Sequence, residues 1–235
     1  MTVEVLFQEV CGLYGDSQNP VYLQKTIPHA EFIFTTLNDN PYFVNNTPDL
    51  IYIGCMSESI QRRVIEKLFP FRDRILELVD RGTVFLATGN AGEIFANKIE
   101  YVTEEITVDG LNLFDLTVKT NLFHRYNSKV LGTVDGIDVV GFRSQFSFLY
   151  GDNSTYPFLT CKRGCGINPE SKLEGMRMHN LICTQLLGPL LPLNPLFTEY
   201  LIELTGNKAD AAFRESAIDA YQVRLKEFQD PSVKF

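Results

Sequence analysis

Residues 82–95 read GTVFLATGNAGEIF, and this stretch decides the fold. Residues 84–87 are a short apolar run, which predicts a buried strand in a parallel sheet. Small residues follow at 89–92, and a helix is expected to open at Glu93. A strand that turns sharply into a helix through small residues is the geometry of a nucleophile elbow, which lifts one side chain above the sheet. The residue at the apex is Gly89, which has no side chain to attack a substrate.

The chain before this elbow alternates strands and helices. The predicted elements are strands at 3–7, 31–36 and 50–54, and a helical stretch over 60–78 that Pro70 kinks. Such alternation predicts an α/β fold with a doubly wound, mostly parallel sheet flanked by helices. Ligands of these sheets bind at the carboxyl ends of the strands. The loops at Gly15, Gly54 and Gly89 are therefore expected to meet there.

The second half of the chain is richer in strands. Asp109-Gly110 and Asp135-Gly136 each lie between alternating segments, which predicts two β-hairpins. Further strands are predicted at 138–142, 158–162 and 175–187, and helices at 194–204 and 209–228. This pattern predicts one domain over residues 1–206, and a C-terminal helical extension over 207–235 that packs on it.

Composition narrows the class of protein. The 235 residues carry a net charge of −8, which disfavours binding to nucleic acid. No apolar run approaches the roughly 18 residues of a membrane span, and the alternating N-terminus is unlike a signal peptide. Five cysteines, among them the isolated C-x3-C pair Cys161 and Cys165, predict reduced thiols and neither a disulfide framework nor a metal site. We expect a cytoplasmic protein without a cofactor.

Four stretches carry a family resemblance, and they occur in the family order. They are LYGD at 13–16 with Asn19, IYIG at 51–54, VGF at 140–142, and TQLLGPLLPLNP at 184–195. They resemble the motifs L-Y-G-D-x-G-N, a strand ending in glycines, V-G-F-E-N-H, and T-Y-L-H-G-P-L-L-P-K-N-P of the class I glutamine amidotransferases. The closest branch is that of cobyric acid synthase and the glutaminase subunit of lipid II isoglutaminyl synthase. The resemblance implies a class I glutamine amidotransferase-like fold.

The departures from these motifs fall on the chemistry. The family has a cysteine nucleophile where Gly89 stands, a histidine base where Leu187 stands, and E-N-H where residues 143–145 read RSQ. The thiolate–imidazolium pair that attacks the glutamine amide is absent. We therefore predict no catalytic residues, no glutaminase activity, and a role as a binding or partner subunit. The resemblance implies a Mur-ligase-like or other synthetase subunit as partner.

Two alternatives stay open. One is an active glutamine amidotransferase that hydrolyses glutamine and passes ammonia to a ligase, with an unrecognised nucleophile or one borrowed from its partner. The other is an enzyme of different chemistry in the same cleft. Three residues of the chain are candidates for a replacement nucleophile, and each has a simpler interpretation. Thr88 should point away from the site, and Cys183 is expected to be a small buried residue. Cys55 is expected to be a plain replacement of an oxyanion-hole glycine. His29, His124 and His179 are isolated, and none falls at the base position.

Binding chemistry is expected to survive at the strand ends. The predicted ligand-binding residues are Gly54, Cys55, Gly89, Asn90 and Arg125. The amides of Gly89, Asn90 and Ala91, at the start of the predicted helix, are expected to form a site for a carboxylate or other anion. Arg125 aligns with an arginine that contacts the glutamine carboxylate in the related glutaminases, so the resemblance implies glutamine or another carboxylate as ligand. The alternative is a solvated arginine that opens a hairpin strand. The apolar run at 186–193 is either cavity filling or a contact patch, with Leu193 at its rim.

Overall fold

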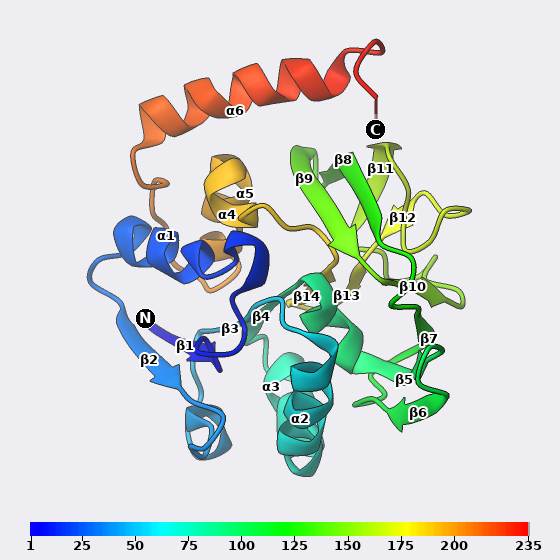
Figure 1. Ribbon diagram of the computed structural model, residues 1–235. Helices are drawn as coiled ribbons and strands as arrows, with labels where there is room; N and C mark the ends of the chain where they lie inside the picture. The colour runs from blue at the N-terminus through cyan, green and yellow to red at the C-terminus, as the bar shows by residue number, and fades with distance from the viewer. Residues whose placement is uncertain (235) are drawn as a thin grey trace.

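A six-stranded sheet runs through the centre of the protein, whose computed structural model describes residues 1–234 (Figure 1). Its strand order is β13-β14-β4-β3-β1-β2, and all neighbours are parallel except β13 and β14. The strands are β1 (Thr2–Leu6), β2 (Glu31–Thr35), β3 (Leu50–Ile53), β4 (Val84–Thr88), β13 (Met176–Met178) and β14 (Leu181–Thr184). The predicted elbow strand, β4, is therefore central, as the apolar run at 84–87 indicated.

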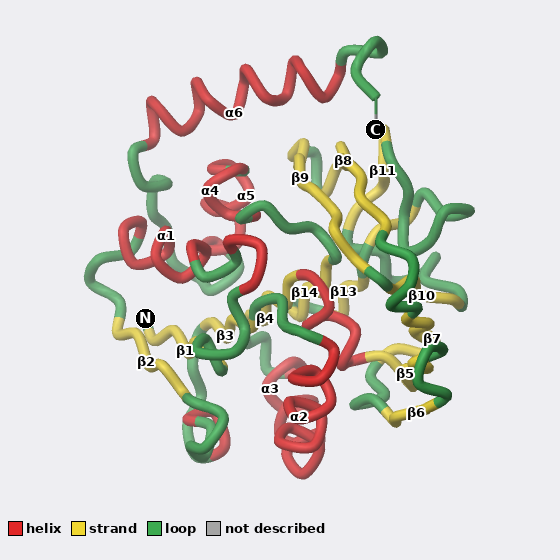
Figure 2. Tube along the Cα trace, viewed as in Figure 1, coloured by secondary structure: helices red, strands yellow, loops and turns green. Residues whose placement is uncertain are grey.

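Helices cover both faces of this sheet. Those on one face are α1 (Gln18–Thr26), α4 (Leu190–Leu193) and α5 (Pro195–Glu203), and those on the other are α2 (Glu58–Leu68) and α3 (Arg72–Asp80) (Figure 2). Each face has its own hydrophobic core, with Leu86 packed on the α1 side and Phe85 on the α2 side. The sharp break between α2 and α3 is a 3₁₀ turn, η3 (Phe69–Phe71), which holds Pro70. The mixed α/β prediction and the kink are confirmed.

Two four-stranded sheets form the other half. One has the order β10-β7-β5-β6 and the other β12-β11-β8-β9. Their strands are β5 (Ala96–Tyr101), β6 (Ile106–Asp109), β7 (Phe114–Thr120), β8 (Tyr126–Val134), β9 (Ile137–Gln145), β10 (Ser147–Tyr150), β11 (Leu159–Arg163) and β12 (Leu173–Glu174). The remaining 3₁₀ turns are η1 (Leu13–Gly15), η2 (Tyr42–Val44) and η4 (Gly89–Phe95).

One of the two predicted hairpins is confirmed and one is wrong. Asp135 and Gly136 both have positive φ and join β8 to β9 in a two-residue turn. Asp109-Gly110 does not join paired strands, because β6 and β7 lie on opposite sides of β5. The chain crosses the start of β5 here, where Gly110 N–H donates to the Asn97 carbonyl at 2.9 Å. A Cβ at Gly110 would overlap the carbonyl oxygen of Ala96, so the glycine serves a close crossing and not a turn.

The long strand predicted at 175–187 is also wrong in its extent. It is two short strands, β13 and β14, that reverse at His179, where φ is +50. The last helix is α6 (Arg214–Gln229), which runs along one side of the molecule over α4, α5 and β9 (Figure 1). It docks through the buried Tyr221, which donates a hydrogen bond to the Asp138 carbonyl at 2.7 Å, and through Phe228 against the Phe142 ring. Within residues 1–234, no helix is long and apolar enough to cross a membrane.

Candidate functional site

The elbow itself is present, without the helix that was predicted to follow it. Gly89 follows β4 directly and has φ +61, a conformation that glycine tolerates and other residues rarely adopt. Residues 89–95 then form the seven-residue η4, which leads straight into β5. The expectation of a helix opening at Glu93 is therefore wrong. The anion site expected at the helix start loses its basis, since one short 3₁₀ segment does not supply an aligned helix dipole.

The space in front of Gly89 is filled by two neighbouring side chains. A Cβ at Gly89 would lie 2.7 Å from Cys55 Cβ, 2.8 Å from Cys55 Sγ and 2.9 Å from Leu187 Cδ2. Real Cβ atoms essentially never come this close to other heavy atoms. Cys55 and Leu187 are both buried, and Leu187 is fixed by paired backbone hydrogen bonds with Phe142. The place of a nucleophile side chain is thus occupied by carbon and sulfur.

Cys55 is a buried thiol beside the elbow. Its thiol is buried and lies 3.4 Å from Asn90 Oδ1, which accepts a hydrogen bond from it. Burial, and then the nearby Asp16 carboxylate, raises the pKa of the Cys55 thiol well above its usual range. The reactive species is the thiolate, and burial disfavours that form of this cysteine.

The backbone N–H groups of Cys55 and Met56 already have hydrogen-bond acceptors. Cys55 N–H donates to Asp16 Oδ2 at 2.9 Å, and Met56 N–H donates to Asn90 Oδ1 at 3.0 Å. Thr88 lies on the far side of the strand end, where its hydroxyl donates to Asp16 at 2.6 Å. Burial raises the pKa of the Asp16 carboxyl to about 6. These contacts brace the loop after β3, and they confirm that the Thr88 hydroxyl points away from the cavity.

A cavity of about 210 Å³ opens beside the elbow. It brings together five positions singled out from the sequence: Cys55, Gly89, Asn90, Arg125 and Leu187. Sites for drug-sized ligands usually measure roughly 300–1,000 Å³, so this one suits a smaller molecule. Its remaining lining comes from five segments, which are η1, the β3–α2 connection with the start of α2, η4, the β9–β10 region and the residue after β14. These residues are Leu13, Tyr14, Met56, Ser57, Glu58, Glu93, Ser144, Gln145, Phe146, Ser147 and Gln185.

Gly54 lies close to this cavity without lining it. A Cβ there would be 2.8 Å from the Cys11 carbonyl oxygen and 3.0 Å from Tyr52 Oη. The glycine therefore allows the loop after β3 to approach the loop after β1. The loops of Gly15, Gly54 and Gly89 do meet at one edge of the sheet, since Leu13 N–H donates to the Cys55 carbonyl at 3.1 Å and Cys55 touches the elbow.

Arg125 lies at the edge of the cavity and packs against two aromatic rings. Its guanidinium carbon lies 4.6 Å from the centre of the Phe146 ring and 5.8 Å from that of Tyr14. Cation–π contacts of this kind hold a cation in place without neutralising it. Its guanidinium makes no ion pair with a carboxylate of residues 1–234, so its charge is available to an anionic group in the cavity.

A buried carboxylate, Glu93, lines the inner end, and the sequence reading missed it. Its Oε1 accepts hydrogen bonds from Ser147 Oγ and from Gln185 Nε2 at 3.2 Å, and its Oε2 accepts one from Gln61 Nε2 at 3.0 Å. Burial raises the pKa of the Glu93 carboxyl to about 7. The signal available in the sequence was a lone glutamate between the elbow glycines and the apolar pair at 94–95, since a charged residue is unusual in an apolar stretch.

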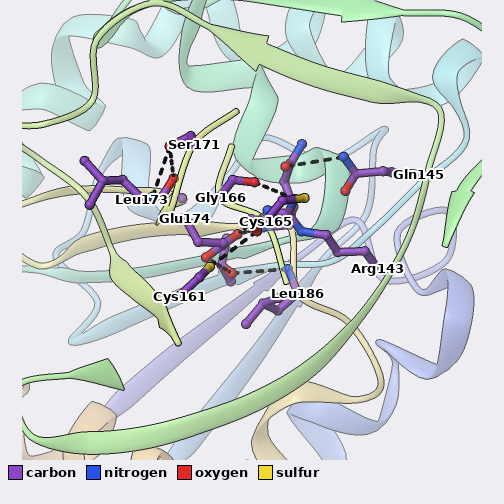
Figure 3. A network of polar contacts seen from close by, with 12 residues as sticks. Arg143, Gln145, Cys161, Cys165, Gly166, Ser171, Leu173, Glu174 and Leu186 are labelled. Atoms are coloured by element: carbon purple, nitrogen blue, oxygen red, sulfur yellow. Dashed lines mark hydrogen bonds and ion pairs between the residues drawn. The ribbon is translucent and has the colours of Figure 1, made fainter. Parts of the chain in front are cut away.

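A buried ion pair, which Figure 3 shows, contacts the backbone of Gln185 in the cavity lining. Arg143 Nη2 is 3.3 Å from Glu174 Oε1, and neither side chain reaches solvent. Glu174 also accepts from the backbone N–H of Gln185 at 2.9 Å and from Thr184 Oγ1 at 2.9 Å. Arg143, the first residue of the altered R-S-Q segment, therefore supports the strand end that carries Gln185. It lies outside the cavity, whereas Ser144 and Gln145 line it.

The other residues weighed from the sequence lie elsewhere. His29, His124 and His179 are exposed and do not line the cavity. All five cysteines are buried and unpaired, and Cys183 packs under Gly92 as a small core residue. Within the apolar run at 186–193, Leu186, Leu187, Leu190 and Leu191 are buried and fill the interior, whereas Leu193 at its rim is half-buried.

Comparison with known structures identifies the class of fold. PurLQS from Thermotoga maritima superposes with a TM-score of 0.55 at 11% identity, over 95% of this chain and 98% of that one. A crystal structure of a glutamine amidotransferase superposes with a TM-score of 0.57 at 14% identity, over 87% of this chain and 99% of that one. The protein therefore has a glutamine amidotransferase-like α/β fold.

Sequence comparison points the same way. The chain is 24% identical over 222 residues to subunit GatD of the glutamine-hydrolyzing lipid II isoglutaminyl synthase of Staphylococcus aureus (strain N315). The match spans 93% of this chain and 90% of that subunit. No family model matches the chain.

Proposed function

We propose that this protein is a glutamine amidotransferase-like subunit that binds a small ligand in its cavity and does not hydrolyse glutamine. The observation that carries the proposal is the elbow, where Gly89 stands at the apex with φ +61 and its side-chain space is filled by Cys55 and Leu187. Hydrolysis of an amide by this class of site needs a nucleophile and a base in contact. Losing a covalent nucleophile in triad enzymes costs on the order of 10⁶ in kcat.

The residues that would bind the ligand are those gathered at the cavity. Arg125 offers an uncompensated cation at the edge, which suits a carboxylate such as that of glutamine or a related amino acid. Asn90 is braced against the backbone of Met56, and Cys55 and Gly89 form the wall. Gly54 contributes by allowing the loop approach and not by contact with the ligand.

The proposal includes a partner subunit. GatD, to which the chain is similar over most of its length, is described as a subunit of a synthase. A Mur-ligase-like or other synthetase subunit is the partner class that the family motifs imply. Size-exclusion chromatography of the native protein from fresh lysate tests this half of the proposal, and a lone monomer of 26.7 kDa would count against it.

The catalytic half is tested by release of ammonia from glutamine. Wild-type protein should give no signal above buffer. Gly89→Cys alone should also give none, because its new side chain would overlap Cys55 and lack a base. The triple variant Cys55→Gly, Gly89→Cys, Leu187→His removes the overlap and supplies both groups, so weak activity is expected. The matched control is Cys55→Gly with Leu187→His, which leaves the nucleophile absent. Glutamate release by wild-type protein would overturn the proposal.

A further inference from the structure

The inner end of the cavity has more hydrogen-bond acceptors than donors. A carboxylate has about four acceptor positions, and the three donors to Glu93 leave one free on Oε2. Gln145, which lines the same cavity, has a buried Oε1 with no donor among residues 1–234. Two acceptors at this end therefore lack a donor from the protein.

The donors at this end are almost all used. Gln61 Nε2 donates to the Asn90 carbonyl at 2.7 Å as well as to Glu93. Gln145 Nε2 donates to the Ser147 carbonyl and, at 3.4 Å, to Gln185 Oε1. The Ser147 hydroxyl is taken by Glu93, so one hydrogen of Gln185 Nε2 remains. A ligand carboxylate placed here would face oxygen atoms, whereas a group rich in N–H would complete the network.

The charges around the cavity favour the same kind of group. The titratable side chains that line it are Tyr14, Cys55, Glu58, Glu93 and Arg125. Arg125 is held on the Phe146 and Tyr14 rings, and no cation of the described chain pairs with Glu93. A buried carboxylate without a counter-ion is costly, and an incoming cation would relieve that cost.

We infer that the cavity binds a small molecule with a terminal ammonium group, and that this group lies against Glu93 and Gln145. The inference rests on the proposed function, because it concerns the same cavity acting as a binding site. It adds the class of ligand: an amino acid with an amine-bearing side chain is preferred over one with a side-chain amide or carboxylate. Glu93 is the residue that sets this preference.

Three probes of nearly equal size test the inference: L-ornithine, L-glutamine and L-glutamate, which end in an ammonium, an amide and a carboxylate. Titration calorimetry at pH 8 should give an affinity for L-ornithine about tenfold or more above that for L-glutamine, as expected for a charge-assisted contact, with L-glutamate weakest. Glu93→Gln should remove the preference for L-ornithine, so that its affinity and that for L-glutamine come within about threefold of each other. Glu66→Gln, an equal loss of charge on the exposed face of α2, should leave the preference intact.

The pH dependence of L-ornithine binding is a second readout. Because the Glu93 carboxyl has its pKa raised to about 7, protonation should weaken L-ornithine binding as the pH falls below that value, approaching about tenfold per pH unit. The same titration with Glu93→Gln should be flat. The thermal midpoint of each variant checks that it is folded.

Several results would overturn the inference. They are equal binding of the three probes, binding of none of them, a preference for L-ornithine that persists in Glu93→Gln, or one that is lost in Glu58→Gln instead. Ammonia release is measured in the same L-glutamine samples. A positive signal there would reject the proposed loss of catalysis, while the order of affinities would still report on Glu93.

Discussion

Two buried carboxylates, Glu174 and Glu93, both contact Gln185 and differ in their other partners. Glu174 accepts from the backbone N–H of Gln185, and Glu93 accepts from its side-chain amide. Glu174 has the Arg143 guanidinium at 3.3 Å, whereas Glu93 is contacted by neutral groups alone within the described chain. Burial raises the pKa of both carboxyls.

This difference distinguishes Glu174, a carboxylate that stabilises the fold, from Glu93, a carboxylate that is available to a ligand. Glu174 and Arg143 neutralise each other in the interior and hold strand ends together, so no ligand is needed there. Glu93 lines a cavity and has a free acceptor position. Perturbed carboxylates in clefts without an internal counter-ion are candidates for function, whereas those in closed ion pairs are candidates for structure.

Breaking the Arg143–Glu174 pair should have the largest effect. Arg143→Met is expected to lower the free energy of unfolding by about 3–5 kcal/mol, because Glu174 is left as an uncompensated buried charge. Urea denaturation at pH 7 measures the change. Adding Glu174→Gln to this variant should recover part of the loss. A single variant as stable as wild type would show that the pair is not the structural element described here.

The Glu93 carboxyl should make stability depend on pH. Its pKa rises from 4.5 to about 7 on folding, so between these values the folded protein holds a proton that the unfolded chain has released. Its contribution is fully present below pH 4.5 and is lost as the pH rises through 7, by up to about 3 kcal/mol. The pKa values of the Asp16 and Glu174 carboxyls are raised as well. The contribution of Glu93 is therefore isolated by comparing wild type with Glu93→Gln. Urea curves from pH 5 to 8 should show wild type losing stability relative to the variant. Parallel curves would contradict the assignment.

Filling the elbow tests the other wall of the cavity. Gly89→Ala should lower the free energy of unfolding by about 1–3 kcal/mol, through overlap with Cys55 and Leu187 and through its positive φ. Gly206→Ala is a matched control, since Gly206 has φ +78 and nothing within 4 Å of an added Cβ. The difference between the two measures the overlap alone. Combining Gly89→Ala with Cys55→Gly should recover that difference, and no recovery would mean that Cys55 does not fill the space.

Removing the exposed arginine should have the smallest effect on stability. Arg125→Met loses two cation–π contacts at the surface, which together stabilise the fold by about 1 kcal/mol or less. Measuring the thermal midpoints of Arg125→Met and Arg143→Met side by side compares the same substitution at an exposed and at a buried arginine. A large loss of stability in Arg125→Met would assign this arginine to the fold and not to ligand binding.

Much of the central architecture was predictable from local patterns. The apolar run at 84–87, the kink at Pro70 and the turn at Asp135-Gly136 each depend on a few neighbouring residues, and each is found as expected. Asp109-Gly110 has the same local signal as the true hairpin. It fails because β5 comes between the two strands, and strand order in a sheet is not encoded by a dipeptide.

The sequence by itself determined that residues 89 and 187 carry neither a nucleophile nor a base, since glycine has no side chain and that of leucine is a hydrocarbon. Only the tertiary structure decided what fills that space and what remains beside it. Cys55 reaches Gly89 because β3 and β4 are neighbours, and Glu93 reaches Gln185 because η4 lies against the end of β14. These contacts join residues 34 to 92 positions apart in the chain, where packing places side chains together and no local pattern records it.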